Sequence, residues 1–379
     1  MMLRSFLPVG QGAFYLEQFK LYNEERINVV YDCGSLTSKQ ILKKEIKSNL
    51  YENETILFVF ISHLDVDHVN GLEFLLHYCN VKYLVLPLTS KNDRYLLSLK
   101  YLCDSNENDM DDFLYRFISN PYETLRRESD NTRIITVRNY DDNESEVLEE
   151  RYNNRTVQSG INILETDYIA ENYLSHYWEY VPFNLRFRDR ANQLIDALNR
   201  CLPEDKRIED IIDLWGHKSI RTAVKKAYSE VDGSLNTNSM TLFSGIQKPD
   251  INQTFILPFN QFRCPIKDYY FDRCIFEVIK PNGCLYTGDY NAKSNWEELY
   301  EAYKTYWNYI GCVQVPHHGS YRNYNSRFSS LNSFFVISAG KNNKYRLPSG
   351  LVIKDLISER KYLFIVTEDK NKEVIMMIH

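Results

Sequence analysis

A short apolar run that ends in a cluster of ionisable residues sets the strongest limit on how this chain can fold. The run is 56-ILFVFI-61, and the next stretch, 62-SHLDVDHVNG-71, places His63, Asp65, Asp67 and His68 within six positions. Such a run is typical of a buried strand. Buried charges cost several kcal/mol apiece unless they are paired or bound to a metal, so the cluster needs a partner of that kind.

Strand-like and helical segments alternate around this cluster. The stretches 27-INVVYDCG-34 and 81-VKYLVLPL-88 have the character of strands, and 38-SKQILKKEIKSN-49 and 72-LEFLLHYC-79 have helical spacing. This alternation predicts an α/β fold. In folds of that class, sites are built on the loops that leave the strand ends.

From Lys91 to Asp232 the sequence pattern changes from short strand-like runs to longer helical ones. Amphipathic helices with charged faces are predicted at 191-ANQLIDALNRC-201, 204-EDKRIEDIIDLW-215 and 217-HKSIRTAVKKAYSEV-231. Strand character then returns, so we expect one α/β domain whose halves are 1–90 and 233–379, separated by a helical insertion at 91–232. Because the insertion lacks any His/Asp cluster, we expect it to serve recognition and not chemistry.

Two later strand-like runs also end in ionisable residues. The run 284-CLYTGDY-290 leads to Asp289, and the run 312-CVQVPHHGS-320 leads to His317 and His318. Three strand ends therefore point to one site.

The residue types at these strand ends are those of a metal centre. Zinc, manganese and iron take imidazole nitrogen and carboxylate oxygen, and two metals about 3.5–4 Å apart can activate water for hydrolysis. His63 and Asp65 alternate along an extended loop and share one side, Asp67 and His68 face a neighbouring position, and Asp289 is placed to bridge. The expected metal ligands are His63, Asp65, Asp67, His68, Asp289 and His317, and the expected catalytic residues are Asp67, His68, Asp289 and His318.

Seven stretches in order resemble a known family. The stretches are 5-SFLPVGQGAF-14, 29-VVYDCGS-35, 62-SHLDVDHVNG-71, 238-NSMTLFS-244, 285-LYTGDY-290, 315-VPHHGS-320 and 336-VISAGKNNKYRLPS-349. Together they look like the hydrolase domain of the DNA-uptake competence protein ComEC and its soluble relatives, within the metallo-β-lactamase fold. The resemblance implies an αββα sandwich with metals at one edge, and its competence members are taken to be metal-dependent nucleases.

The resemblance also assigns residues outside the main cluster. It makes Asp32 a buried residue that orients the His-Asp loop, and it puts Asn238 and Ser239 where many members of the fold have a third ligand histidine. This chain departs from the family at Pro8, where Asp is frequent, and at Leu347, where a histidine precedes the proline. The second departure removes a possible ligand or proton donor.

The function that these residues favour is a metal-dependent phosphodiesterase or nuclease with two divalent ions, Mn²⁺ or Zn²⁺. Arg322, Arg327 and Lys344 follow the last two motifs and could bind flanking phosphates. One alternative is a hydrolase of a small ester, lactone or nucleotide, because this fold hosts many substrates. Another is a partner-binding subunit with a vestigial site, in which the insertion binds a protein. An effector hydrolase that works beside an ATPase in a prokaryotic defence system would combine the nuclease with such a partner-binding role.

Charge and hydropathy limit the partners and the cellular location that we expect for this protein. The net charge of −6 and the pI near 5.8 argue against a long basic surface, so any contact with nucleic acid should be short. The N-terminal stretch lacks the pattern of a signal peptide, and no apolar stretch approaches the roughly 18 residues that span a bilayer. We therefore expect a cytoplasmic protein with no membrane contact.

Overall fold

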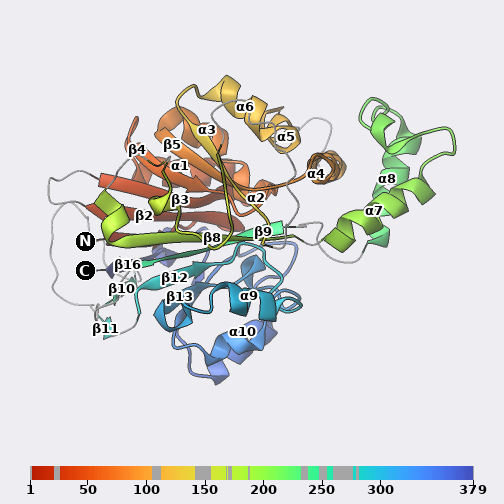
Figure 1. The fold of residues 1–379 in the computed structure, drawn as a ribbon. Coiled ribbons are helices and arrows are strands. Elements are labelled where there is room, and N and C mark those ends of the chain that lie inside the picture. Colours follow the sequence, from red (N-terminus) through yellow and green to blue (C-terminus); the bar gives the residue numbers. More distant parts are fainter. Residues whose placement is uncertain are drawn as a thin grey trace.

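The strands of this protein form two sheets that lie face to face, with helices on the outer side of each (Figure 1). The structure is a computed structural model. It describes residues 2–20, 26–104, 112–140, 155–167, 169, 173–186, 188–231, 238–246, 254–258, 276–278 and 281–378.

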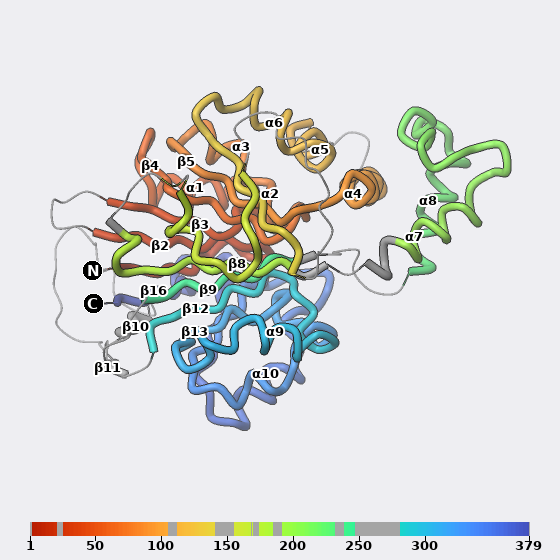
Figure 2. The backbone as a smooth tube through the Cα atoms, in the orientation of Figure 1, coloured from red at the N-terminus to blue at the C-terminus, as the bar shows by residue number. Residues whose placement is uncertain are grey.

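In the described residues, the first sheet has ten strands in the order β11-β10-β16-β1-β2-β3-β4-β5-β6-β7. Their bounds are β1 Met2–Phe6, β2 Gly12–Lys20, β3 Arg26–Ser35, β4 Thr55–Phe60, β5 Asn80–Pro87, β6 Arg133–Val137, β7 Arg155–Val157, β10 Thr254–Pro258, β11 Phe276–Val278 and β16 Val374–Ile378. Strands β3 to β7 run parallel. Strand β1 pairs antiparallel with β16, which brings the two ends of the chain side by side (Figure 2).

The second sheet has six strands within the described ranges, in the order β15-β14-β13-β12-β9-β8. Their bounds are β8 Trp178–Arg186, β9 Asn238–Ile246, β12 Gly283–Tyr286, β13 Ile310–Gln314, β14 Phe334–Ser338 and β15 Leu363–Val366. Strands β12 to β15 are parallel, and β9 is antiparallel to both β12 and β8. Parallel strands put their carboxyl ends at one edge, so the loops after β12 and β13 are neighbours.

Helices cover the outer faces of both sheets. Their bounds are α1 Lys39–Asn49, α2 Val66–Val69, α3 Leu72–Tyr78, α4 Lys91–Asp104, α5 Asp112–Ser119, α6 Pro121–Glu128, α7 Arg188–Cys201, α8 Lys218–Glu230, α9 Trp296–Ala302 and α10 Gly350–Ser358. Helices α1, α3, α5 and α6 pack on the first sheet, and α9 and α10 pack on the second. No helix in the described part of the chain is long and apolar enough to cross a membrane.

The apolar run in β4 is explained by burial on both faces. Phe58 and Phe60 lie in the core between the two sheets, whereas Val59 and Ile61 lie under the helices of the first sheet. A strand buried on both sides shows no apolar–polar alternation, which is why the run is continuous. The layers are helix, sheet, sheet, helix, and the predicted metallo-β-lactamase-like αββα sandwich is confirmed.

In its described parts, the segment 91–232 contains helices α4 to α8, and it is also built into the sandwich. It contributes β6 and β7 to the first sheet and β8 to the second. The predicted helix at 204–215 is not continuous, since only the short 3₁₀ turn Ile208–Asp210 forms within it. The helix pair α7–α8 lies to one side of the sandwich, next to α4 (Figure 1).

Helix α4 packs against two different parts of the protein. Its residues Leu97 and Tyr101 join the core under the first sheet. Its residues Leu96, Leu99 and Leu102 pack instead against α7 and α8. The helix therefore connects the sandwich to the α7–α8 pair.

Candidate metal centre

The ionisable loop leaves the carboxyl end of β4 and turns into the short helix α2. His63 is 4% exposed and His68 is 1% exposed, so the loop runs into the protein and not over its surface. Asp65 stands at the start of α2, where its carbonyl accepts a hydrogen bond from the amide of His68 at 3.0 Å. This short helix places Asp67 and His68 on the side that faces the second sheet.

The second sheet supplies the facing residues from the loops after β12 and β13. Asp289 follows β12, and its backbone amide donates to the hydroxyl of Ser239 at 3.0 Å. His317 and His318 follow β13, and both have left-handed backbones, with φ of 51° and 53°. That conformation is uncommon outside glycine, and it turns the two adjacent imidazoles in different directions.

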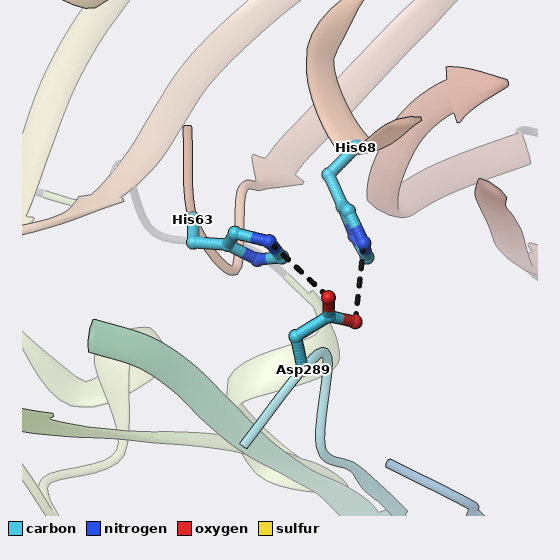
Figure 3. Close-up of side chains that lie close together, drawn as sticks. All are labelled: His63, His68 and Asp289. Atoms are coloured by element: carbon cyan, nitrogen blue, oxygen red, sulfur yellow. Dashed lines mark ion pairs between the residues drawn. The ribbon is translucent and has the colours of Figure 1, made fainter. Parts of the chain in front are cut away.

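The carboxylate of Asp289 lies between two histidines of the first sheet (Figure 3). Its Oδ1 is 3.3 Å from Nε2 of His68, and its Oδ2 is 3.7 Å from Nε2 of His63. Oδ2 is also 3.5 Å from Nε2 of His317. The ligand atoms of His63, His68 and Asp289 all lie within 4.8 Å of one another, which is close enough to share a metal ion.

A second grouping overlaps the first. Asp67, His68 and His318 also have ligand atoms within 4.8 Å of one another. Nε2 of His318 is 3.2 Å from Oδ2 of Asp67 and 3.9 Å from Oδ1 of Asp289. His68 belongs to both groupings, so the two lie side by side around Asp289.

Hydrogen bonds on the far side of each ring orient the histidines. His68 donates from Nδ1 to Asp32 at 2.7 Å, and His318 donates from Nδ1 to the carbonyl of Ser338 at 2.8 Å. The hydroxyl of Ser62 donates to Asp32 at 2.8 Å, so it accepts from Nδ1 of His63 at 2.9 Å. With Nδ1 of each ring engaged in this way, Nε2 of each ring is left to face a carboxylate, and in the neutral form of a ring that nitrogen carries a lone pair.

These residues fit a metal ion, as the surroundings of their buried imidazole nitrogens show. Nε2 of His63 and Nε2 of His68 are buried and have no hydrogen-bond partner among the described residues. Buried lone pairs that face carboxylates repel them unless a cation lies between. Imidazole with ionised carboxylate is the donor set that zinc and manganese prefer.

The charges of the cluster keep its carboxylates ionised. Burial raises the pKa of Asp289, but His317 and His68 outweigh burial and hold the pKa well below its usual range. The pKa of Asp67 is also lowered, because His68 and His318 outweigh the effect of burial. Burial lowers the pKa of His63, with a further contribution from His68. Ionised carboxylates and a neutral His63 are the forms that bind metals.

Burial also lowers the pKa of His68, but Asp32 and then Asp289 outweigh it, so the pKa of His68 is raised. Burial likewise lowers the pKa of His318, but Asp67 outweighs burial and the pKa of His318 is raised. These two rings therefore attract positive charge at Nε2, and a metal ion would provide that charge in place of a proton.

A residue that the sequence did not single out also reaches the centre. Nζ of Lys100, from α4, lies 2.8 Å from Oδ2 of Asp65. Burial lowers the pKa of Lys100, but Asp65 outweighs it and the pKa is raised. The segment 91–232 was expected to stay out of the chemistry, yet it contacts one of the expected ligands. The available signal was the placement of this lysine between Leu99 and Tyr101, which are both buried.

The basic residues expected to bind substrate lie at the surface. Arg322, Arg327 and Lys344 are exposed. Arg327 forms an ion pair with Glu297. Lys344 comes close enough to Asp104, at the end of α4, for its charge to act on that carboxyl group.

Positions outside the main cluster that the family resemblance singled out have structural roles in this chain. Ser239 is buried and holds the backbone of Asp289, whereas the side chain of Asn238 lies outside the described residues. Leu347 is partly buried, and its carbonyl accepts from the side chain of Asn343 at 2.6 Å. Pro8 lies in the buried turn between β1 and β2.

One of the comparisons with known proteins bears on the fold. Residues 21–102 match the family model described as the Metallo-beta-lactamase superfamily. A comparison with curated proteins gave no match. Among solved structures, the chain is similar to a long form RNase Z from yeast at 10% identity and a TM-score of 0.35. That alignment covers 93% of this chain but 38% of the yeast chain.

A similarity at that level carries no conclusion about activity. The superfamily match stands independently of it, and it contains the whole loop from His63 to His68 together with Lys100. The chain thus has a metallo-β-lactamase-like sandwich fold, and residues 21–102 carry the sequence pattern of the Metallo-beta-lactamase superfamily.

Proposed function

We propose that this protein is a metal-dependent phosphodiesterase that acts on nucleic acid. The observation that carries the proposal is the position of Asp289, whose Oδ1 faces His68 and whose Oδ2 faces His63. A carboxylate in that position can bind two cations at once. The superfamily match supports a hydrolase, and the resemblance to the ComEC hydrolase domain supports a nuclease.

One set of ligands lies on each side of Asp289. The first set is Asp67, His68 and His318, and the second set is His63 and Asp65, with His317 at its border. When bound, the metals would lower the pKa of a water molecule and stabilise charge on the attacking and leaving oxygens. The donor set combines three carboxylates with imidazoles, and each carboxylate oxygen favours Mn²⁺ over Zn²⁺ in relative terms.

The roles expected for the two adjacent histidines are better exchanged. Both nitrogens of His318 are engaged, with Ser338 at Nδ1 and Asp67 at Nε2, and the residue is buried. The side chain of His317 is 25% exposed. We therefore assign His318 as a metal ligand and His317 as the histidine that can contact the substrate while bordering the second set.

Exposed basic side chains would position the phosphates of the substrate. Lys344 and Arg322 lie on the two loops that follow β14 and β13, and both are exposed. The charges of Lys344, of Lys225 on α8 and of Lys100 all act on Asp104, so three separate segments bring positive charge to one neighbourhood. Arg327 is already paired with Glu297, so we expect a smaller contribution from it.

The test begins with the metal content of the purified protein. The protein is then incubated with single-stranded, duplex and circular DNA, with RNA, and with a generic phosphodiester, each in Mn²⁺ and in Zn²⁺. We expect cleavage of nucleic acid that depends on the metal. His68→Ala should abolish it, because the variant removes a ligand shared by both groupings while the fold is kept.

A histidine outside the site provides the matched control. His77 on α3 pairs with Glu128, and its side chain is 53% exposed. His77→Ala should retain metal and turnover. Metal content and turnover that are unchanged in His68→Ala would overturn the assignment, and hydrolysis of small esters or lactones without any of nucleic acid would move the substrate to another class.

A further inference from the structure

One ligand position of the centre already has a cation beside it. Oδ2 of Asp65 is bound by Nζ of Lys100 at 2.8 Å, and the same oxygen is the one that lies 3.9 Å from Nε2 of His63. A metal held by His63 and this nearer oxygen of Asp65 would share the oxygen with the ammonium group. The two positive charges would then lie within hydrogen-bonding reach of one atom, where they repel strongly.

On the other side of Asp289, the ion pairs that Asp67 forms within the described residues are with imidazoles and not with a lysine or an arginine. Asp67 faces the imidazoles of His68 and His318, and each ring is oriented by a hydrogen bond from its Nδ1. The ligand atoms of this grouping lie within 4.8 Å of one another, whereas Asp65 belongs to neither grouping that meets this limit. The two halves of the centre are therefore unequal before any metal binds.

Lys100 is held in place by its helix. Its neighbours Leu99 and Tyr101 are buried on opposite sides of α4, against α7–α8 and against the sandwich respectively. The side chain of Lys100 is 23% exposed and that of Asp65 is 18% exposed, so solvent only partly screens the pair. An ion pair with a fixed backbone and limited solvent access is not easily displaced.

We propose that Lys100 sets the number of metal ions that the centre binds. Its ammonium group stands in for a second cation at Asp65, so that the half formed by Asp67, His68 and His318 fills first. The half that contains His63 and Asp65 fills only when Lys100 leaves Asp65. This inference rests on the proposed metal-dependent function, and it goes beyond it by assigning unequal affinities and naming their cause.

Metal titration tests the inference without any measurement of activity. The metal-free protein is titrated with Mn²⁺, and separately with Zn²⁺, by calorimetry, and metal content is measured after gel filtration. We expect one tight equivalent in the wild-type protein. Lys100→Met should strengthen binding of the second equivalent by about 10-fold or more, because it removes a unit positive charge from beside Asp65.

Two further variants make the result specific. Lys91→Met removes the same charge from an exposed position at the start of α4 and should titrate as the wild type does. Asp65→Asn removes the contested oxygen and should keep the tight equivalent while losing the second. If Lys100→Met does not fold, Lys100→Gln, which keeps a polar group at the end of the side chain, is used in its place.

The outcomes separate the two proposals. Two tight equivalents in the wild type, identical curves for wild type and Lys100→Met, or loss of the tight ion in Asp65→Asn would each overturn the role of Lys100 and leave the metal centre standing. Failure of every protein to bind metal would overturn the metal-dependent function as well.

Discussion

Nδ1 of His68 lies 2.7 Å from Oδ2 of Asp32, a residue 36 positions earlier in the chain. Asp32 stands in β3 at the point where its pairing with β2 shifts register, and its backbone is left-handed, with φ of 57°. Its carboxylate also accepts from the amide and the hydroxyl of Ser62, at 2.7 and 2.8 Å. A bulge of this kind can aim one side chain at a site.

Asp32→Asn tests the importance of that carboxylate for metal binding. Asparagine tolerates the left-handed backbone, but its amide group cannot accept at both positions that Asp32 occupies. We expect metal affinity to fall by about 10- to 100-fold. The measurement is a chelator competition assay, with Asp93→Asn, a buried aspartate that accepts from Ser90, as the control. Equal affinities in the two variants would contradict the prediction.

Gly34→Ala should disturb the loop that carries His63 to His68, because the backbone of that loop lies directly against Gly34. A Cβ at this position would lie 2.3 Å from the carbonyl carbon of Asp67 and 2.4 Å from the amide nitrogen of His68. Backbone atoms cannot give way as the end of a flexible side chain can, so we expect a loss of about 1–3 kcal/mol in stability together with weaker metal binding.

The matched control for that substitution is Gly350→Ala. A Cβ there would meet nothing within 4 Å, and the position lies at the start of α10. Thermal unfolding and metal titration of both variants provide the comparison. A Gly34→Ala protein with wild-type stability and wild-type metal affinity would show that the close approach to the loop is unimportant.

The buried ion pair between Arg4 and Glu17 should dominate the stability of the core between the sheets. Nε of Arg4 donates to Glu17 at 2.7 Å, and the hydroxyls of Tyr180, Tyr286 and Ser244 donate to the same carboxylate. Glu17→Leu leaves a buried guanidinium without its carboxylate, so we expect a loss of about 3–5 kcal/mol in unfolding free energy.

Denaturant unfolding measures this loss, and a double variant shows its origin. Arg4→Met combined with Glu17→Leu removes both charges, so it should recover part of the stability that Glu17→Leu loses. A double variant less stable than Glu17→Leu would point to lost packing of the Arg4 side chain and not to an unpaired charge.

The free energy of unfolding should fall as the pH rises, because of two neighbouring glutamates near the C-terminal strand β16. Burial, and then the charge of Glu45, raise the pKa of Glu373 to about 7, with Lys370 partly opposing them. The native state therefore holds a proton that the unfolded chain, with an ordinary glutamate pKa of about 4.3, has lost. Between these two values, each rise in pH favours the unfolded state.

Glu373→Gln removes this dependence. We expect the variant to be more stable than the wild type at pH 8 by about 1–3 kcal/mol and nearly equal to it at pH 4. Thermal unfolding at the two pH values gives the comparison, and Glu359→Gln, at an exposed position, serves as the control. A difference of the same size at both pH values would exclude titration as its cause.

Much of the fold could be predicted because the relevant signals are local. The continuous run in β4 indicated burial on both faces, and residues such as Asp289 and His318 follow later strands in the same manner. Parallel strands gather their carboxyl ends at one edge, so sequence order alone indicated which side chains meet. The structure brings the expected residues into two groupings, His63, His68 and Asp289 and then Asp67, His68 and His318, each with ligand atoms within 4.8 Å of one another, whereas Asp65 and His317 belong to neither.

The features that could not be predicted depend on contacts across the fold. Strands β6, β7 and β8 arise within a segment dominated by helical patterns, and short strands acquire their identity from the sheet that they join. The stretch 204–215 has helical periodicity, but only a 3₁₀ turn forms at Ile208–Asp210. The pairing of Lys100 with Asp65 joins residues on two different helices, and no spacing along the chain encodes it.

Helix α4 is fixed between two bodies, with Leu97 and Tyr101 against the sandwich and Leu99 against α7–α8. Lys100 lies between two of these anchors, so its distance from Asp65 depends on how the helix is seated on both sides. A tilt of α4 imposed by a movement of the α7–α8 pair would lengthen or shorten that ion pair. The ion pair at the metal centre is thus coupled, through one helix, to the packing of an apolar core that contains none of the expected ligands.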